Sequence, residues 1–157
     1  MSSFYVFKSV QFRDMVEKHK MIADFEQLIY TPEMLRKEWG KFPAHFKGLI
    51  SGGWTNMSVV NLIEYILLTK YADQFFPGSS IGTLLISKPK KGKLNYQQTL
   101  AVSVDNLTNK ISLQYSNWDT IDKSEDSEKA ILWRKDCSED QLIEAFEEFI
   151  KWNKSWY

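Results

Sequence analysis

The segment between Trp118 and Trp133 concentrates acidic side chains, which are the residues of this chain best suited to chemistry or binding. Five acids lie within ten residues and have few basic neighbours: Asp119, Asp122, Glu125, Asp126 and Glu128. Carboxylates can hold a cation, transfer protons in a glycoside hydrolase, or attract a basic protein. An EF-hand loop needs oxygen ligands at alternate positions and a central glycine, and "DTIDKSEDSEKA" has neither. A hydrolase needs two carboxylates across a cleft, which spacing along the chain does not reveal.

Two interpretations of these acids remain open. They can form a solvated loop between two strands, as charge runs commonly do. They can instead form a negative surface that docks on a basic protein, with Trp118, Tyr115 or Trp133 as the aromatic anchors that interfaces favour. The second interpretation predicts a partner-binding surface made of Trp118, Asp119, Asp122, Glu125, Asp126 and Glu128.

Cys137 is the only cysteine, so no disulfide can form within the chain. Arg134, Lys135 and the start of the next helix would lower the pKa of its thiol and make it reactive. As the residue before the helix cap, it can equally pack against Leu142. The candidate bases for a Cys-His pair are His19 and His45, and so small a set of ligands predicts no dedicated zinc site and no cofactor.

The sequence "SKPKKGK", residues 87–93, is the one basic cluster. It could contact phosphates, although it lacks the P-loop pattern, or it could be an exposed turn. A nucleic-acid site would need other lysines on the same face, such as Lys41, Lys47 and Lys110. The whole chain carries 20 basic and 20 acidic side chains, and this balance predicts no nucleic-acid partner and no membrane partner.

The first half of the chain has helical periodicity. Apolar residues at helical spacing predict an amphipathic helix within residues 9–30. Thr31-Pro32-Glu33 is a typical helix start, and that helix should end near Gly40. A further turn or two is expected over residues 43–49. After a break at Gly52-Gly53, a long buried helix is expected over residues 55–75, ending before Pro77-Gly78.

The second half changes to the two-residue period of strands. Residues 80–88 predict a strand, residues 98–118 a hairpin that turns near Asp105-Asn106, and residues 129–135 a further strand. A closing helix should start at Ser138, with Gln141 completing the cap. Its apolar face would consist of Leu142, Ile143, Phe146, Phe149 and Ile150.

These elements predict an α+β fold with N-terminal helices, an antiparallel sheet of three to four strands and a closing C-terminal helix. The 157 residues fit a single domain, 1–157, with a helical part over about 1–77 and the sheet plus C-terminal helix over about 80–157. The first residues lack the apolar core of a signal peptide, and the lone cysteine suits a reducing compartment, so a cytoplasmic location is expected.

The C-terminal pattern "ISLQYSNWD…ILWRKDCSEDQLIEAFEEFIKW" resembles the immunity proteins of bacterial polymorphic toxins, including those of contact-dependent growth inhibition systems. The resemblance implies a non-enzymatic antitoxin that holds a cognate toxin domain, often a nuclease, inactive in a tight complex. Nuclease active sites meet phosphates and are often basic, so an acidic inhibitor can cover them. Two other hypotheses remain: a small enzyme or ligand-binding adaptor with an unrecognised site, and a nucleic-acid binder that uses the 87–93 loop.

Overall fold

The helices that precede the sheet begin at residues with capping side chains. The computed structural model describes residues 28–156, in which Thr31 Oγ1 accepts a hydrogen bond from Met34 N at 3.2 Å and Asn56 Oδ1 accepts one from Ser58 N at 3.1 Å. These side chains satisfy amide groups that the first helical turn leaves unpaired. The three helices are α3 (Pro32–Gly40), α4 (Phe42–Ser51) and α5 (Met57–Leu67).

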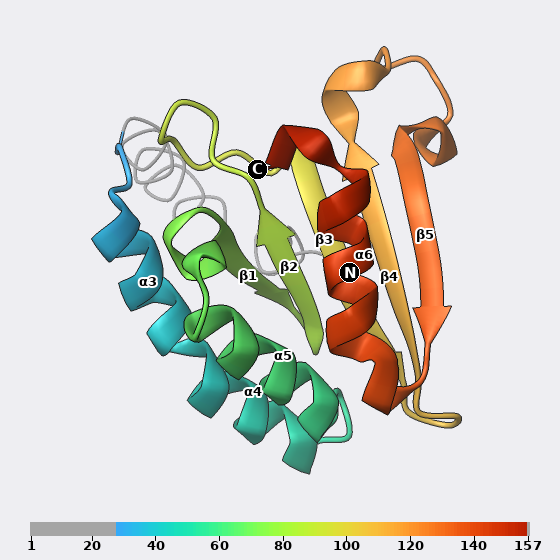
Figure 1. The fold of residues 1–157 in the computed structure, drawn as a ribbon. Coiled ribbons are helices and arrows are strands. Elements are labelled where there is room, and N and C mark those ends of the chain that lie inside the picture. Colours follow the sequence, from blue (N-terminus) through green and yellow to red (C-terminus); the bar gives the residue numbers. More distant parts are fainter. Residues whose placement is uncertain (1–27, 157) are drawn as a thin grey trace, which may run out of the picture.

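Five strands form one antiparallel sheet in the order β1-β2-β3-β4-β5 (Figure 1). They are β1 (Phe76–Ser80), β2 (Thr83–Ser87), β3 (Gln98–Asp105), β4 (Lys110–Asn117) and β5 (Ile131–Cys137). Every second residue of the central strands is buried, as expected for a sheet with one covered face. These residues include Leu84, Ile86, Leu100, Val102, Ile111, Leu113 and Tyr115.

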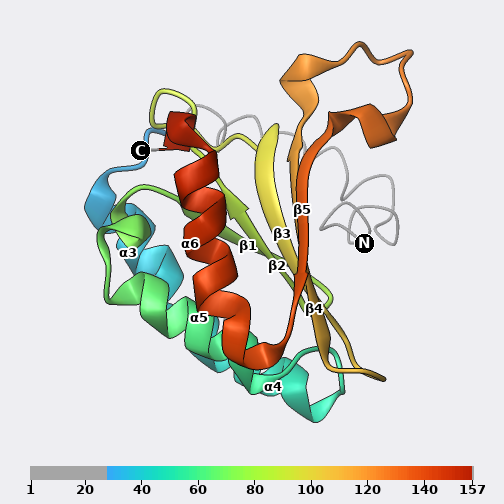
Figure 2. The ribbon, with the colours of Figure 1, turned by 45° about the vertical axis from the view of Figure 1, so that its right-hand side comes forward.

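The helices of residues 28–156 lie on one face of the sheet, and their apolar sides complete the core (Figure 2). Helix α6 (Leu142–Trp152) contributes Leu142, Phe146, Phe149 and Ile150, which expose 1% of their surface or less. The indole nitrogen of the buried Trp39 donates a hydrogen bond to the Phe75 carbonyl at 2.8 Å. None of the helices in residues 28–156 is long and apolar enough to cross a membrane.

Two charged side chains connect the helices. Arg36 on α3 forms an ion pair with Asp73 at 2.7 Å and donates to the Thr69 carbonyl at 2.9 Å, close to the end of α5. Glu147 on α6 accepts hydrogen bonds from the hydroxyls of Tyr65 and Tyr71. The bond to Glu147 raises the pKa of Tyr65 to about 12. These contacts fix α3 and α6 against the segment around the end of α5.

The α+β prediction is confirmed, and so are the helix start at Thr31-Pro32, the break at Gly52-Gly53, the hairpin and the closing helix. The expected number of strands, three to four, is too low. The missed strand is β1, which contains Pro77 and Gly78 and was expected to be a break. Proline lacks an amide hydrogen, but an edge strand such as β1 tolerates it.

The predicted boundaries of several elements are wrong. Residues 55–75 form α5 and then a short 3₁₀ helix, Lys70–Asp73, which Thr69 caps. Helix α4 runs over ten residues, longer than the turn or two expected. The strand expected over 80–88 contains a turn at Ile81-Gly82, and Ile143 is 37% exposed instead of lying in the core.

The helix predicted within residues 9–30 falls mainly on residues 9–27, which lie outside the described part of the chain. The described end of that range is not helical. Ile29 forms an isolated antiparallel bridge with Lys93, and Tyr30 N donates to the Gly92 carbonyl at 2.7 Å. Residues 29–30 therefore pair with the turn that contains the basic cluster.

Gly82 offers a test of how the β1–β2 turn packs. A Cβ atom at this position would lie 2.1 Å from the Trp54 carbonyl oxygen, and φ is +81°. We expect Gly82→Ala to lower the free energy of unfolding by about 2–5 kcal/mol, because overpacking adds to the cost of a left-handed residue. Gly53→Ala is the control, since Gly53 has φ +74° with nothing near its Cβ position. Urea unfolding should show a smaller loss of unfolding free energy for Gly53→Ala than for Gly82→Ala. Equal losses in the two variants would contradict the predicted clash.

Candidate functional site in the acidic loop

The loop that joins β4 to β5, residues 118–130, lies at one end of the sheet and begins with a short 3₁₀ helix, Trp118–Thr120 (Figure 1). Asn117 holds this helix: its Oδ1 accepts from Asp119 N at 3.0 Å, and its carbonyl accepts from Thr120 Oγ1 at 2.7 Å. The amide of Trp118 donates to the Gln97 carbonyl at 2.9 Å. The start of the loop is thereby tied to the residue that precedes β3.

The far end of the loop is ordered by one of its own acids. Asp126 Oδ1 accepts a hydrogen bond from Glu128 N at 3.1 Å, and the Asp126 carbonyl accepts one from Lys129 N at 3.0 Å. These bonds cap the 3₁₀ helix Ser127–Ala130, whose last residue is fully buried. The loop is therefore anchored at both ends and exposes its middle.

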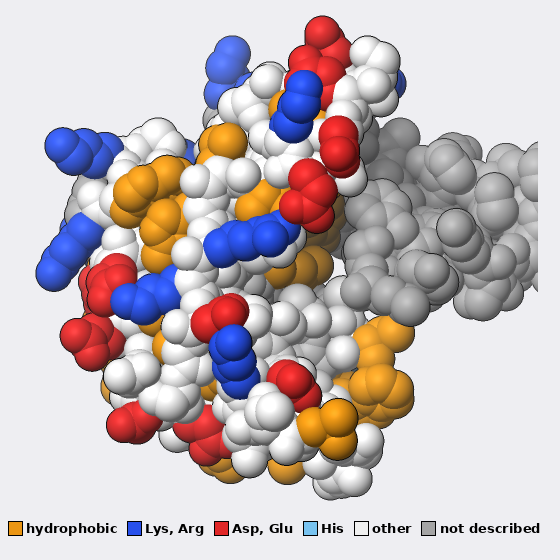
Figure 3. All heavy atoms as spheres, turned by 90° about the vertical axis from the view of Figure 1, so that its right-hand side faces the viewer, with side chains coloured by type: hydrophobic (Ala, Val, Ile, Leu, Met, Phe, Trp, Pro, Cys, Tyr) orange, Lys and Arg blue, Asp and Glu red, His pale blue; other side chains and the backbone are white. Residues whose placement is uncertain are grey.

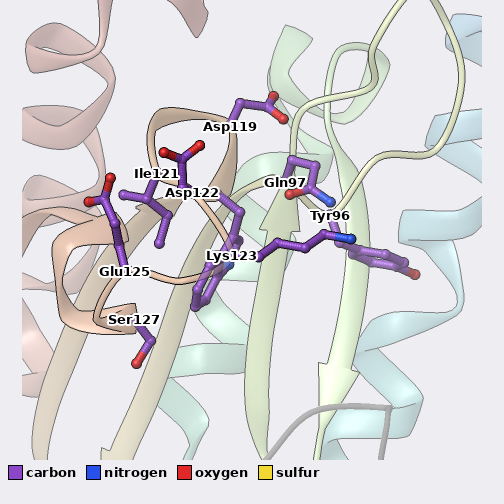
Figure 4. A pocket seen from close by; sticks show the side chains of 9 residues that line it. Tyr96, Gln97, Asp119, Ile121, Asp122, Lys123, Glu125 and Ser127 are labelled. Atoms are coloured by element: carbon purple, nitrogen blue, oxygen red, sulfur yellow. The ribbon is translucent and has the colours of Figure 1, made fainter.

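A hollow of about 980 Å³ opens between this loop and the segment before β3 (Figure 4). Ile121, Asp122 and Glu125 lie on one side of it, and Tyr96 and Gln97 lie on the other, with Lys123 extended between the two sides. Three carboxylates and one ammonium group give this lining a formal charge of −2. The lining residues are Tyr96, Gln97, Trp118, Asp119, Ile121, Asp122, Lys123, Glu125 and Ser127.

The structure divides the five loop acids into two groups. Asp119, Asp122 and Glu125 line the hollow, whereas Asp126 and Glu128 do not. Glu128 forms an ion pair with Arg134 of β5 at 2.7 Å, and Asp126 caps the short helix. Glu125 is 3.8 Å from Lys129. The carboxylates of Asp119 and Asp122 form no ion pair with any residue in the range 28–156.

The aromatic residues of the site differ from those suggested by the sequence. Trp118 is 44% exposed and lines the hollow, as an anchor should. Tyr115 is 2% exposed, and Trp133 packs against Phe149 with ring centroids 5.3 Å apart, so both belong to the core region. Tyr96, which is 38% exposed, lines the hollow although it lies 22 residues before Trp118. Partial burial raises the pKa of the Tyr96 phenol.

The lining of the hollow combines three carboxylates with one aliphatic hydroxyl group. Ser127 is the one side chain with an aliphatic hydroxyl among its lining residues, and the lining contains no histidine or cysteine to activate it. Nowhere in residues 28–156 do three or more His, Cys, Asp or Glu side chains come together as metal ligands. The exposed Trp118 is of a residue type that is enriched at the energetic centres of protein interfaces, whereas acidic residues are depleted there.

Cys137 and His45 do not form a catalytic pair. Burial raises the pKa of the Cys137 thiol and outweighs the effect of Lys135, so the expectation of a lowered pKa is wrong. Cys137 belongs to the same core cluster as Leu142, in agreement with the packing interpretation. The described contacts of His45 are to Ser79, at 3.2 Å, and to Phe42 and Phe46. His19 lies outside the described residues.

The basic cluster forms a tight turn. Lys90 and Lys93 exchange backbone hydrogen bonds of 2.9 and 3.0 Å around Lys91 and Gly92. The lysines that would have to join them in a phosphate-binding face each form an ion pair with an acid of the chain. The pairs are Lys41 with Glu38, Lys47 with Glu64, and Lys110 with Asp136. This arrangement weighs against the nucleic-acid hypothesis.

Comparison of the chain with known proteins finds no matching family model, no matching curated protein and no matching solved structure.

The capping role of Asp126 can be tested separately from its acidic neighbours in the loop. We expect Asp126→Ala to speed amide hydrogen exchange at Glu128 and Lys129 about fivefold, because a lost cap costs about 1 kcal/mol. Asp126→Asn should retain the cap and the slow exchange. Asp122→Ala should leave exchange unchanged, since the Asp122 carboxylate forms no ion pair with a described residue. Exchange as fast in Asp122→Ala as in Asp126→Ala would contradict this division of roles.

Proposed function

We propose that the chain is a non-enzymatic inhibitor that binds and neutralises a cognate toxin domain through the hollow of the acidic loop. The observation that carries the proposal is the pair Asp119 and Asp122. Both line the hollow beside the exposed Trp118, and neither has a cation partner among the described residues.

Unpaired carboxylates favour a partner that supplies cations. Lysine and arginine side chains of a basic protein can enter the hollow and pair with Asp119 and Asp122, and an arginine can also stack on the Trp118 ring. Ile121 adds apolar contact beside these charges. Complementary charges speed association, so binding should be faster at low salt.

The partner class follows from the charge and from the resemblance of the C-terminal pattern to immunity proteins. A toxin that cleaves nucleic acid needs a basic surface to hold phosphates, and such a surface complements the hollow. Masking it would inhibit the toxin without any chemistry by the inhibitor. The complex would form in the cytoplasm, where the toxin meets its target.

The first experiment is affinity capture of the tagged chain from its native cytoplasm at low and moderate salt, with mass spectrometry of the retained molecules. The proposal expects one stoichiometric basic protein that elutes more readily as salt rises. A nuclease or other toxic activity in that protein, suppressed by the chain, would support inhibition. Retention of a nucleic acid or a small metabolite in place of a protein would contradict the proposal.

Charge reversal locates the interface. We expect the double substitution Asp119→Lys and Asp122→Lys to weaken binding of the captured partner about tenfold or more, mainly through slower association. Neither carboxylate pairs with a cation of the described chain, so circular dichroism and the melting temperature should stay close to those of the unmodified protein.

The matched control is Glu33→Lys with Glu144→Lys. These acids are exposed, form no ion pair with a described residue, and lie on α3 and α6. The control changes the net charge by the same amount, so an equal loss of affinity in both variants would indicate long-range attraction alone. Unchanged affinity in the Asp119/Asp122 variant would remove the hollow from the interface.

A further inference from the structure

Three loops meet at the end of the sheet opposite the acidic loop. They are the α4–α5 connection, the β1–β2 turn and the β3–β4 turn. The side-chain amide of Asn106 donates a hydrogen bond to the Gly53 carbonyl, which joins the first loop to the third. The backbone at Gly82 packs so closely on Trp54 that no side chain fits between them, which joins the first loop to the second.

These loops expose large apolar side chains. Leu107 is 96% exposed, Trp54 53%, Ile81 51%, and Met57, at the start of α5, 48%. We call these four residues the three-loop tip. Figure 3 views the molecule from the β5 side and shows hydrophobic side chains at the lower right, with acidic side chains both at the top and in the lower half. Clustered apolar exposure of this kind marks interaction sites, whereas scattered exposed residues do not.

The backbone at the tip is strained. Ile81 has φ +43° and Gly82 has φ +81°, which is the conformation of a two-residue hairpin turn that favours asparagine followed by glycine. A β-branched residue is an outlier in the left-handed region. The turn therefore holds an exposed apolar side chain where a polar residue would be more stable.

Two buried hydroxyl groups adjoin the tip and lack partners. Thr55, next to Trp54, is 4% exposed, and Ser80, next to Ile81, is 5% exposed. The hydroxyl oxygens of both form no hydrogen bond with any residue in the described range. Two of the three unsatisfied buried side-chain groups among the described residues therefore adjoin the tip, and the third is Asn153 Nδ2. Such groups and strained residues are rare, and they often occur at functional surfaces.

The charges around the tip restrict what can bind there. Asp105 accepts a hydrogen bond from Leu107 N, and Glu139 accepts one from Asn56 Nδ2 at 2.9 Å, so both carboxylates lie beside the tip. Neither forms an ion pair with a residue that the structure describes, whereas Lys110 is neutralised by Asp136 at 3.0 Å. This negative rim would repel an anionic membrane, a nucleic acid and a second copy of itself.

We propose that the three-loop tip is a second binding surface, for a protein segment whose apolar side chains are flanked by lysine or arginine. The apolar side chains would cover Leu107, Trp54 and Ile81, and the cations would pair with Asp105 and Glu139. This inference does not rest on the proposed function, because the tip lies at the other end of β4 and β5 from the acidic hollow.

The strain at Ile81 gives a first test of the argument. Asparagine fits the left-handed conformation better than isoleucine, so Ile81→Asn should raise the melting temperature by about 2–4 °C. Calorimetry of the full chain measures the change. A lower melting temperature would show that Ile81 stabilises the fold, and it would overturn the view that this residue is kept for binding.

The binding test uses a library of random peptides displayed on phage and selected on the immobilised full chain. We expect the selected peptides to combine aromatic or aliphatic residues with lysine or arginine. Their affinity should fall at least tenfold in Ile81→Asn and in Leu107→Ser, both of which alter exposed side chains. Leu68→Ser is the matched control, since Leu68 is 88% exposed at the end of α5 and lies outside the tip.

Several results of the peptide selection would overturn the proposal. Peptides that lack basic residues, or that bind Ile81→Asn and Leu107→Ser as tightly as the unmodified chain, would contradict it, and so would a library that yields no binders. Sedimentation that shows a dimer lost in these two variants would identify a second copy as the occupant instead. The Asp119/Asp122 variant should bind the peptides normally, so failure at the tip is distinguishable from failure of the hollow.

Discussion

Burial of one face of the sheet beneath α5 and α6 is the constraint on which the rest of the structure depends. The inward residues of β2, β3 and β4 pack with Val59, Ile63, Phe146 and Phe149 in one core cluster. This arrangement buries the inward side chains of every central strand. Most residues of the connections at the two ends of the sheet lie outside this core cluster. Those ends are where the acidic hollow and the three-loop tip lie, so the core fixes their positions without limiting their composition.

The sequence predicts the fold class because local signals and packing agree along most of the chain. Thr31, Asn56 and Ser138 all stand before helices, and the alternation in residues 98–118 matches the buried face of β3 and β4. The prediction fails at β1, where Pro77 and Gly78 suggest a break. Pairing of β1 with β2 outweighs this tendency to break the strand. The missing amide hydrogen of a proline costs a ladder hydrogen bond only where a neighbouring strand lies on the side that the amide would face, and an edge strand has a neighbour on one side alone.

The candidate site could be predicted only in part. A cluster of acids is visible in the sequence, but which acids are free depends on partners supplied by the fold. Glu128 is neutralised because β5 brings Arg134 to 2.7 Å, and Asp126 is committed to a cap. Asp119 and Asp122 differ from them only in having no such partner among the described residues. Tyr96 lines the hollow because the Trp118 amide donates a hydrogen bond to the carbonyl of the next residue, Gln97. This contact joins residues far apart in the sequence, so no local sequence pattern predicts it.

The two ends of the sheet suit different steps of recognition. Under the proposed function, charges in the open hollow would act at a distance of about 8–10 Å, within the screening length at ordinary salt, and would guide a basic partner as it approaches. The apolar side chains of the tip would act only on contact, and as a binding surface they would contribute through slower dissociation. A strand of seven residues such as β5 separates the two surfaces by roughly 20–25 Å. One small domain could contact both, whereas two short peptides would each occupy one, so the size of the partner decides whether the surfaces act together.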